Sequence, residues 1–443
     1  MKLIAIRQNF QYKMICGLIS FCVLFHNYQY FSQVPVYVKL LVPDDIYQFG
    51  STFHLYMFHY SYGFLPRALW NSVCLGLYKC FQLCGIHVSQ VSFVFVFWWI
   101  FSTVCLIYLF WLYRKFRPYI EKQSELGLLL YDVFCVFGMW HLSYTQFMYH
   151  TNTDLPIICL LSVCLICVQK QKWLWVFVTC ILMCLTHEGV FFFGLPLVTS
   201  FILCVNLNAN EIQKRKECLY SVLILGIGFG FLMYFCILFP KLYDGEMLYQ
   251  KMSIEFWSLF DYVLPEYRII YPAVVELLLG DTMNFMTNNV VMMGDKVFSN
   301  MIVFVGINIV NALYVICLIP LLVCVKQIIR NEIINDTTIF LKNCFSTYIL
   351  YAGFIWMVLL MITKTDQGRW WFFVWIYYGV ICGYLLLRDQ VKDLQIKHKR
   401  IYSISMVLLY LLLMFPSDRV FITYFWHNVM KAVLVGLDYI WMG

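Results

Sequence analysis

The chain has 443 residues, of which 62% are hydrophobic and only 12% charged, and its mean hydropathy is +0.76. Because soluble domains are about half apolar and about a quarter charged, this composition excludes a soluble protein with a large core. The net charge of +7 is informative through its placement along the chain, and no nucleic-acid partner is expected.

Apolar runs long enough to cross about 30 Å of hydrocarbon recur along the whole length. In lipid such runs must be helical, because each backbone N–H and C=O group needs a hydrogen-bond partner within the chain. We therefore predict an all-α polytopic transmembrane bundle that forms a single domain over 1–443. The predicted spans are 14–32, 91–113, 126–143, 154–169, 173–187, 189–206, 219–239, 301–325, 344–363, 370–387 and 401–416, with a twelfth candidate at 420–442 that could instead lie along the membrane interface.

Basic residues favour one side of this arrangement, since 20 of the 31 Lys and Arg residues fall in alternate short loops. Loops rich in Lys and Arg stay in the cytoplasm, so we predict a multi-pass protein of the cell membrane with a cytoplasmic N-terminus. The 20 residues are Lys2, Arg7, Lys13, Arg114, Lys115, Arg117, Lys122, Lys170, Lys172, Lys214, Arg215, Lys216, Lys326, Arg330, Lys342, Arg388, Lys392, Lys397, Lys399 and Arg400.

Two long segments fall on the opposite, non-cytoplasmic side. The first, 33–90, is aromatic and semi-polar, and we expect it to form helices that lie on the membrane surface. The second, 240–300, is rich in acidic residues. Because the cytoplasmic loops are short by comparison, any chemistry is expected at the external face, on helix ends and loops.

An acidic pair, Asp44 and Asp45, follows the first predicted span directly. One carboxylate there can act as a general base toward a sugar hydroxyl. The pair can also share a divalent cation that neutralises a phosphate leaving group, and such an ion is the one cofactor that these residues suggest. The alternative is a solvated loop or a helix cap, a position that Asp favours.

Two stretches of this first external loop resemble the GT-C superfamily of membrane glycosyltransferases. The run Pro43-Asp44-Asp45-Ile46-Tyr47-Gln48 is similar to an acidic loop motif of that superfamily, and Tyr62-Gly63-Phe64-Leu65-Pro66-Arg67-Ala68-Leu69 is similar to its Gly-hydrophobic-Pro-Arg stretch. The resemblance covers roughly 30 residues and the overall layout. It implies a sugar donor linked to polyprenyl phosphate, and it implies that either Asp44 or Asp45 is the catalytic base.

Arg67 and the pair His187-Glu188 are the other candidate site residues in the first half of the chain. The guanidinium group of Arg67 can fork onto a donor phosphate, whereas the alternative is ordinary contact with lipid headgroups. His187 and Glu188 lie between strongly apolar flanks, where ionisable groups are costly and therefore functional or paired. His187 can shuttle a proton or hold a phosphate oxygen, and Glu188 can orient it or take a metal; the alternative is a polar turn between two helices.

A third group lies between the ninth and tenth predicted spans. Asp366 and Arg369 are three residues apart, so they can pair where a helix begins, and Arg369 is then placed to reach a diphosphate. Trp370 can stack on the face of a sugar. The alternative is an ion pair at a helix start with interfacial Trp.

Three other ionisable residues and the cysteines have structural explanations. Asp132 lies inside the third span and is expected to be paired there. Asp154 is expected to cap the following span, with a second acid of the site as the alternative, and His59, among aromatic residues, is expected to lie at the membrane interface. Most of the 19 Cys residues lie within apolar runs, where we interpret them as small hydrophobic residues rather than as a disulfide framework.

Together these residues predict a membrane glycosyltransferase of GT-C type. It would transfer a sugar from a polyprenyl-(di)phosphate donor to a cell-envelope or surface glycan acceptor, with membrane lipid around it. The nearest alternative is a polymerase of surface polysaccharide. A second alternative, a lipid-linked glycan transporter or flippase, calls for charges near the membrane midplane, whereas here they gather at helix ends.

Overall fold

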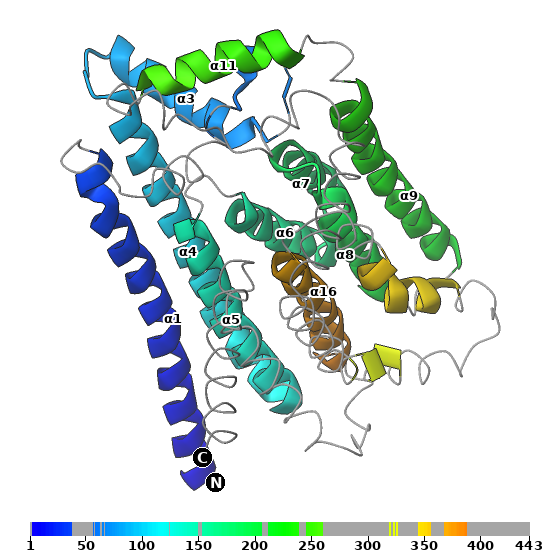
Figure 1. Cartoon of the computed structure of the whole chain (residues 1–443). Helices are drawn as coiled ribbons and strands as arrows, with labels where there is room; N and C mark the ends of the chain where they lie inside the picture. Colours follow the sequence, from blue (N-terminus) through cyan, green and yellow to red (C-terminus); the bar gives the residue numbers. More distant parts are fainter. Residues whose placement is uncertain are drawn as a thin grey trace, which may run out of the picture. The chain divides into compact units, whose positions relative to one another are not determined.

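The structure is a computed structural model, and every regular element in the part of the chain that it describes is helical (Figure 1). The predicted all-α class is therefore confirmed for these residues. The described residues are 2–37, 56, 58–62, 64, 65, 67–123, 125–148, 153–205, 211–238, 245–259, 319, 322, 323, 325, 326, 344–355 and 367–387.

The helices follow the apolar runs of the sequence closely. Their bounds are α1 Lys2–Tyr37, η2 Tyr60–Tyr62, α3 Leu69–Leu83, α4 Gln90–Gln123, α5 Glu125–Met148, α6 Asp154–Gln169, α7 Trp173–Thr186, α8 Val190–Val205, α9 Glu211–Met233 with a π-helical turn at Tyr234–Leu238, α11 Gly245–Leu259 and α16 Gln367–Leu387. A further apolar helix covers Cys344–Ile355. The predicted spans 401–416 and 420–442, and all but four residues of 301–325, lie outside the described residues.

The predicted and the observed helix boundaries agree best where polar turns interrupt the apolar runs. The prediction 154–169 coincides with α6, because a short turn follows in which Gln171 takes a positive φ of 53° and stops the helix. Helix α7 ends at Thr186, since His187 is extended. Asp154 is the first residue of α6 rather than its cap, which is Thr153 without a side-chain cap bond.

Helix α4 runs ten residues beyond the predicted span 91–113, because its last turns are held by ion pairs. Arg117, predicted in a loop, is buried and donates from Nε to Oδ1 of Asp132 at 3.1 Å. It also donates to Glu121 one helical turn later, at 3.2 Å. The prediction that Asp132 is paired is confirmed, and the pair shows why this basic residue lies inside a helix.

Only two helices among the described residues are long and apolar enough to cross a membrane, Gln90–Lys122 and Arg215–Met233. Five shorter apolar helices have 10–17 residues each. A helix of 16 residues is about 24 Å long, somewhat less than the hydrocarbon layer. The predicted helices that fall within the described residues are confirmed, whereas the number of membrane crossings stays a prediction.

The chain divides into two compact units, 1–116 with 138–202 and 210–282, and 117–137 with 203–209 and 283–443. In the first unit, the segment between α1 and α4 packs against α11 through a buried apolar cluster. Its members from the first segment include Tyr56, Phe58, Leu65 and Cys74, and its members from α11 are Met252, Phe256 and Trp257. The two long segments that the sequence places on one side of the membrane are thus in direct contact.

In the second unit, α16 is buried along most of its length, and it contacts both Phe134 of α5 and the helix Cys344–Ile355. Tyr377 and Tyr378 each donate a hydroxyl hydrogen bond of 2.8 Å across this contact, to the carbonyl oxygens of Ile349 and Leu350. The contact is close because Gly353 has no Cβ, so that the Tyr377 ring lies directly over the backbone.

Candidate functional site

Arg67 has an unusual backbone conformation immediately before α3. Its φ is +58°, in the left-handed region that residues other than glycine rarely adopt. Such strain costs on the order of 1–3 kcal/mol and persists where the surrounding contacts hold it, often at functional sites. The conformation places the side chain of Arg67 against the turn between α7 and α8, rather than along the axis of α3.

The guanidinium group of Arg67 forms a side-on ion pair with Glu188, 121 residues later in the chain. Its Nε atom lies 3.1 Å from both carboxylate oxygens, and its Nη2 atom donates to Oε1. Both side chains are largely buried, with exposed fractions of 16% for Arg67 and 10% for Glu188. Separation of the two side chains would leave two buried charges without partners, which is costly. The ion pair therefore fixes both side chains in place.

His187 completes the turn, and its contacts indicate the tautomer of the neutral ring. The backbone N–H of Gly189 donates to Nδ1 of His187 at 2.9 Å, so the neutral ring carries its proton on Nε2. Nδ1 also lies 3.6 Å from Glu188, but it cannot donate there while it accepts the Gly189 hydrogen. A Cβ added to Gly189 would lie 3.1 Å from the imidazole ring, so this glycine keeps room for the ring.

A second contact joins α3 to the same turn. The indole Nε1 of Trp70 donates to Thr186 Oγ1 at 3.1 Å, and the Thr186 hydroxyl in turn donates to the carbonyl oxygen of Leu182 at 2.7 Å. Trp70 and Arg67, both in the predicted external loop, therefore bond to the two ends of the Thr186–Glu188 turn. The sequence named Arg67, His187 and Glu188 separately, and the structure brings them together.

Glu188 is held in its ionised form. Burial by itself raises the pKa of Glu188, but the positive charge of Arg67, the charge of His187 when its ring is protonated, and the Arg67 hydrogen bonds outweigh it, and the pKa falls well below its ordinary value. The contribution of this pair to stability is therefore present above the ordinary Glu pKa of about 4.3 and is lost only in strong acid. At neutral pH the carboxylate acts as a fixed anchor, not as a proton carrier.

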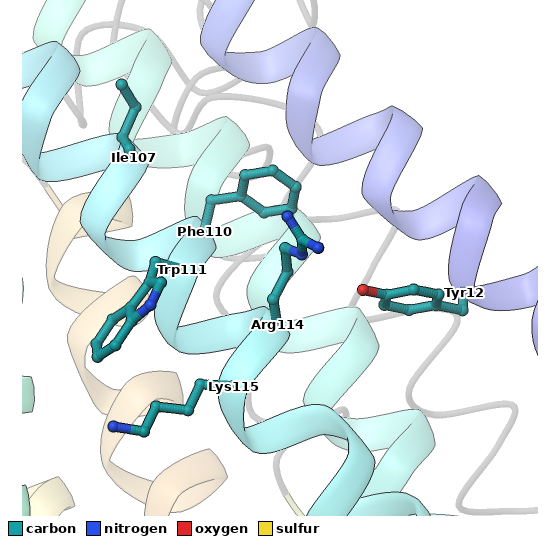
Figure 2. Close-up of a pocket in the computed structure, with 6 residues that line it drawn as sticks. All are labelled: Tyr12, Ile107, Phe110, Trp111, Arg114 and Lys115. Atoms are coloured by element: carbon teal, nitrogen blue, oxygen red, sulfur yellow. The ribbon is translucent and has the colours of Figure 1, made fainter.

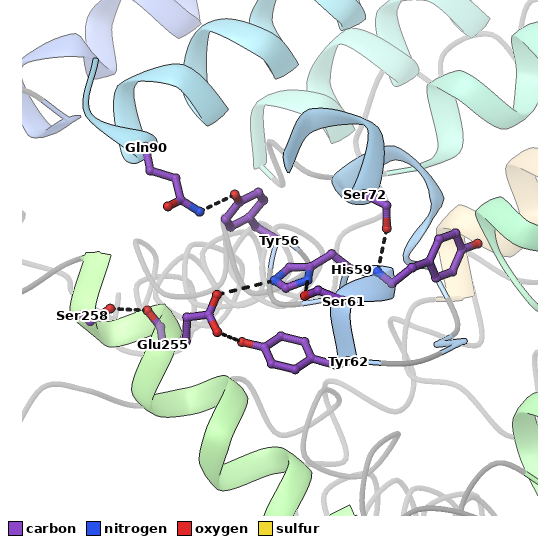
Figure 3. A network of polar contacts seen from close by, with 9 residues as sticks. Tyr56, His59, Ser61, Tyr62, Ser72, Gln90, Glu255 and Ser258 are labelled. Atoms are coloured by element: carbon purple, nitrogen blue, oxygen red, sulfur yellow. Dashed lines mark hydrogen bonds and ion pairs between the residues drawn. The ribbon is translucent and has the colours of Figure 1, made fainter. Parts of the chain in front are cut away.

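Beside this site, a second polar network joins the first segment to α11 (Figure 3). The hydroxyl of Tyr62 donates to Oε2 of Glu255, and Oε1 of the same carboxylate lies 4.0 Å from Nε2 of His59. The hydroxyl of Ser61 is a close partner of His59 Nδ1. The ring of Tyr56 contacts the ring of His59, with the ring centres 6.3 Å apart, and Gln90 at the start of α4 donates to the Tyr56 hydroxyl at 2.8 Å.

His59, predicted to lie at the membrane interface, is buried within the protein with 4% of its surface exposed, and its depth in the membrane stays a prediction. Its pKa is lowered, chiefly by burial, so that the ring is neutral at physiological pH. Sequence reasoning missed the role of Glu255, since it is one of many acidic residues in the second long segment. Only its position on α11, one turn from the buried Met252 and beside Phe256, brings it to Tyr62.

The other predicted site residues are not brought to this site by the described part of the structure. Asp44, Asp45 and Asp366 lie outside the described residues. Arg369 and Trp370 belong to the first turn of α16, where only the backbone is described, and α16 is in the second compact unit. Their predicted roles stay predictions.

The arrangement is suited to holding an anion. The bonds to Glu188 use Nε and Nη2 of Arg67, and within the described residues no partner is bonded to the hydrogens of Nη1. A phosphate oxygen beside Nη1 would receive hydrogen bonds from a guanidinium group whose orientation is already fixed. No three His, Cys, Asp or Glu side chains of the described residues gather as a metal site, and Asp44 and Asp45 lie outside them.

Comparison of the chain with protein-family models, with curated proteins and with solved structures finds no significant match. The assignment of function therefore depends on the residues of this site and on their chemistry.

Proposed function

We propose that the chain is an integral membrane glycosyltransferase that takes a sugar from a polyprenyl-(di)phosphate donor. The observation that carries this proposal is the convergence of Arg67, His187 and Glu188 in one largely buried cluster. Arginine in such a setting recognises phosphate through planar, paired hydrogen bonds. A strained backbone at Arg67 and a carboxylate that fixes its guanidinium group are the features of a preorganised anion site.

In this proposal Arg67 binds the phosphate that leaves the sugar, and Glu188 keeps the guanidinium group in place. The acceptor hydroxyl gives its proton to Asp44 or Asp45, and its oxygen forms a bond to the anomeric carbon. The bond between that carbon and the phosphate oxygen breaks, and the electron pair stays on the leaving polyprenyl (di)phosphate. Arg67, with His187 beside it and Arg369 as a further candidate, stabilises the negative charge that develops there.

The proposed topology places this cluster on the non-cytoplasmic side, with the N-terminus in the cytoplasm. Two observations support it. The first long segment, α11 and the turn at 187–189 belong to the same compact unit, and α3 and α11 lie at the Gln90 end of α4 (Figure 1). The opposite end of α4 carries Arg114, Lys115 and Lys122, as expected for a cytoplasmic end.

The experiment is a transfer assay with variants of Arg67. In proteoliposomes supplied with a radiolabelled polyprenyl-linked sugar, Arg67→Lys is expected to lower turnover by about 10²-fold or more, the scale for losing one donor that stabilises a developing anion. Lysine keeps the charge but lacks the planar fork. The matched control is Arg215→Lys on an exposed position of α9, which should transfer normally.

The assay also defines what would contradict the proposal. Normal turnover of Arg67→Lys would reduce Arg67 to a structural partner of Glu188. The absence of sugar transfer by the folded parent chain with any polyprenyl-linked donor would contradict the transferase function itself. Product length then separates the alternatives, because a polymerase adds whole repeat units whereas a simple transferase adds a single sugar.

A further inference from the structure

A groove between α1 and α4 lies far from the candidate site along α4 and is not used by the proposed transfer reaction. It has a volume of about 720 Å³ and is lined by Tyr12, Ile107, Phe110, Trp111, Arg114 and Lys115 (Figure 2). Its volume falls in the range of about 300–1,000 Å³ that is usual for small-molecule sites. All six residues belong to the first compact unit.

The lining changes from apolar to cationic along the helix axis. Ile107, Trp111 and Lys115 are spaced four residues apart, and so are Phe110 and Arg114, so that each cation lies one turn beyond an aromatic ring. The ammonium group of Lys115 lies 4.6 Å from the centre of the Trp111 ring, a cation–π contact. The six described lining residues include two cations and no carboxylate. The groove therefore matches a ligand with an apolar part and an anionic end.

The depth of the groove identifies the source of that ligand. Arg114 is 24 residues beyond Gln90, which at 1.5 Å per residue is about 36 Å along α4. Gln90 bonds to Tyr56, whose ring contacts His59 of the polar network beside the candidate site. Since the hydrocarbon layer is about 30 Å thick, the proposed topology places the two cations at the opposite headgroup layer. Figure 2 shows the Tyr12 hydroxyl directed from α1 toward the face of α4 that carries Phe110 and Arg114.

We propose that this groove binds an anionic phospholipid of the cytoplasmic leaflet. The lipid phosphate lies at Arg114 and Lys115, and one acyl chain follows Phe110 and Ile107 toward the middle of the membrane. Basic pockets between membrane helices on the cytoplasmic side are suited to anionic headgroups, and that leaflet is rich in them. The inference rests on the proposed membrane location, but it needs no sugar donor and no catalytic residue.

The test is a lipid titration of the purified full-length chain in detergent, followed by native mass spectrometry. The chain is expected to prefer phosphatidylglycerol over phosphatidylcholine with the same acyl chains. The double variant R114Q/K115Q should weaken phosphatidylglycerol binding about 25-fold, since each basic residue contributes roughly fivefold, and should leave phosphatidylcholine binding unchanged. The matched control K170Q/K172Q removes two exposed cations that are also predicted to be cytoplasmic, and it should keep the preference.

Three outcomes would overturn the proposal: equal binding of the two lipids by the parent chain, an equal loss in the control, or displacement of the lipid by millimolar inorganic phosphate, which would identify a free-phosphate site. Because Arg114 and Lys115 are exposed, the variants should fold. The single variant R114Q should bind phosphatidylglycerol about fivefold more weakly, and this partial loss distinguishes a local effect from unfolding. If the chain transfers sugar but shows no lipid preference, the proposed lipid site is wrong and the proposed transferase function stands. If it prefers phosphatidylglycerol but transfers no sugar, the proposed function is wrong and the lipid site stands.

Discussion

At the scale of single residues, the site depends on two positions where the backbone is unusual. Arg67 has a left-handed backbone, and Gly189 lies so close to the His187 ring that a Cβ would touch it. The first directs a guanidinium group toward Glu188, and the second lets the imidazole lie over the turn. Neither effect can be recognised from residue type alone, since the chain has 22 Gly residues and Arg is common near membrane surfaces.

Gly189→Ala tests whether the position of His187 matters for the reaction. The added methyl group must push the ring by a few tenths of an ångström, because the Cβ would lie 3.1 Å from Nδ1 and Cε1. Small displacements of catalytic groups are costly, and 1 Å can lower a rate by about 10²-fold, so turnover should fall by about tenfold. The measurement is kcat for sugar transfer together with the thermal unfolding midpoint.

The matched control for this substitution is Gly226→Ala in α9, where a Cβ meets nothing within 4 Å. It should leave kcat unchanged and should stabilise the helix slightly, since alanine favours helices. If Gly189→Ala transfers sugar as fast as the parent chain, the ring has no positional role in the reaction.

At the scale of elements, α11 is held to the first long segment mainly by apolar contacts. Met252, Phe256 and Trp257 are each at most 5% exposed, and burial of such a side chain contributes about 1.5–3 kcal/mol. The hydrogen bond from Tyr62 to Glu255 adds less, because the Glu255 side chain is 50% exposed to solvent. The polar network therefore fixes the position of α11, whereas the apolar residues supply most of the binding energy.

Tyr62→Phe separates these two contributions. Loss of the hydroxyl should lower the free energy of local opening by about 1 kcal/mol, which corresponds to roughly fivefold faster hydrogen exchange in 245–259. Trp257→Ala should release α11 much further, since it removes a buried aromatic side chain. Tyr28→Phe, at a tyrosine 69% exposed on α1, is the control and should change nothing. Equal exchange in Tyr62→Phe and the parent chain would mean that the Tyr62 bond contributes nothing to docking.

At the scale of the whole molecule, the proposed topology makes a statement about accessibility that native residues can test. Cys80 and Cys84, at the end of α3, are exposed thiols in the segment predicted to be external. A membrane-impermeant maleimide should label both in intact cells, as read by peptide mass mapping. Lys172→Cys, in the turn between α6 and α7, should be labelled only after permeabilisation. The reverse pattern would overturn the orientation and, with it, an external site.

The sequence by itself determined the helical class, the positions of most helices and the separate candidates Arg67, His187 and Glu188. It could do so because apolar runs long enough for lipid must be helical, and because isolated charges between such runs are costly. Only the tertiary structure decided that Arg67 pairs with Glu188, that His59 is buried and that Glu255 contacts Tyr62. These contacts join residues more than 100 positions apart, or depend on one φ angle and on which face of α11 is buried, and no local pattern in the chain records such distances.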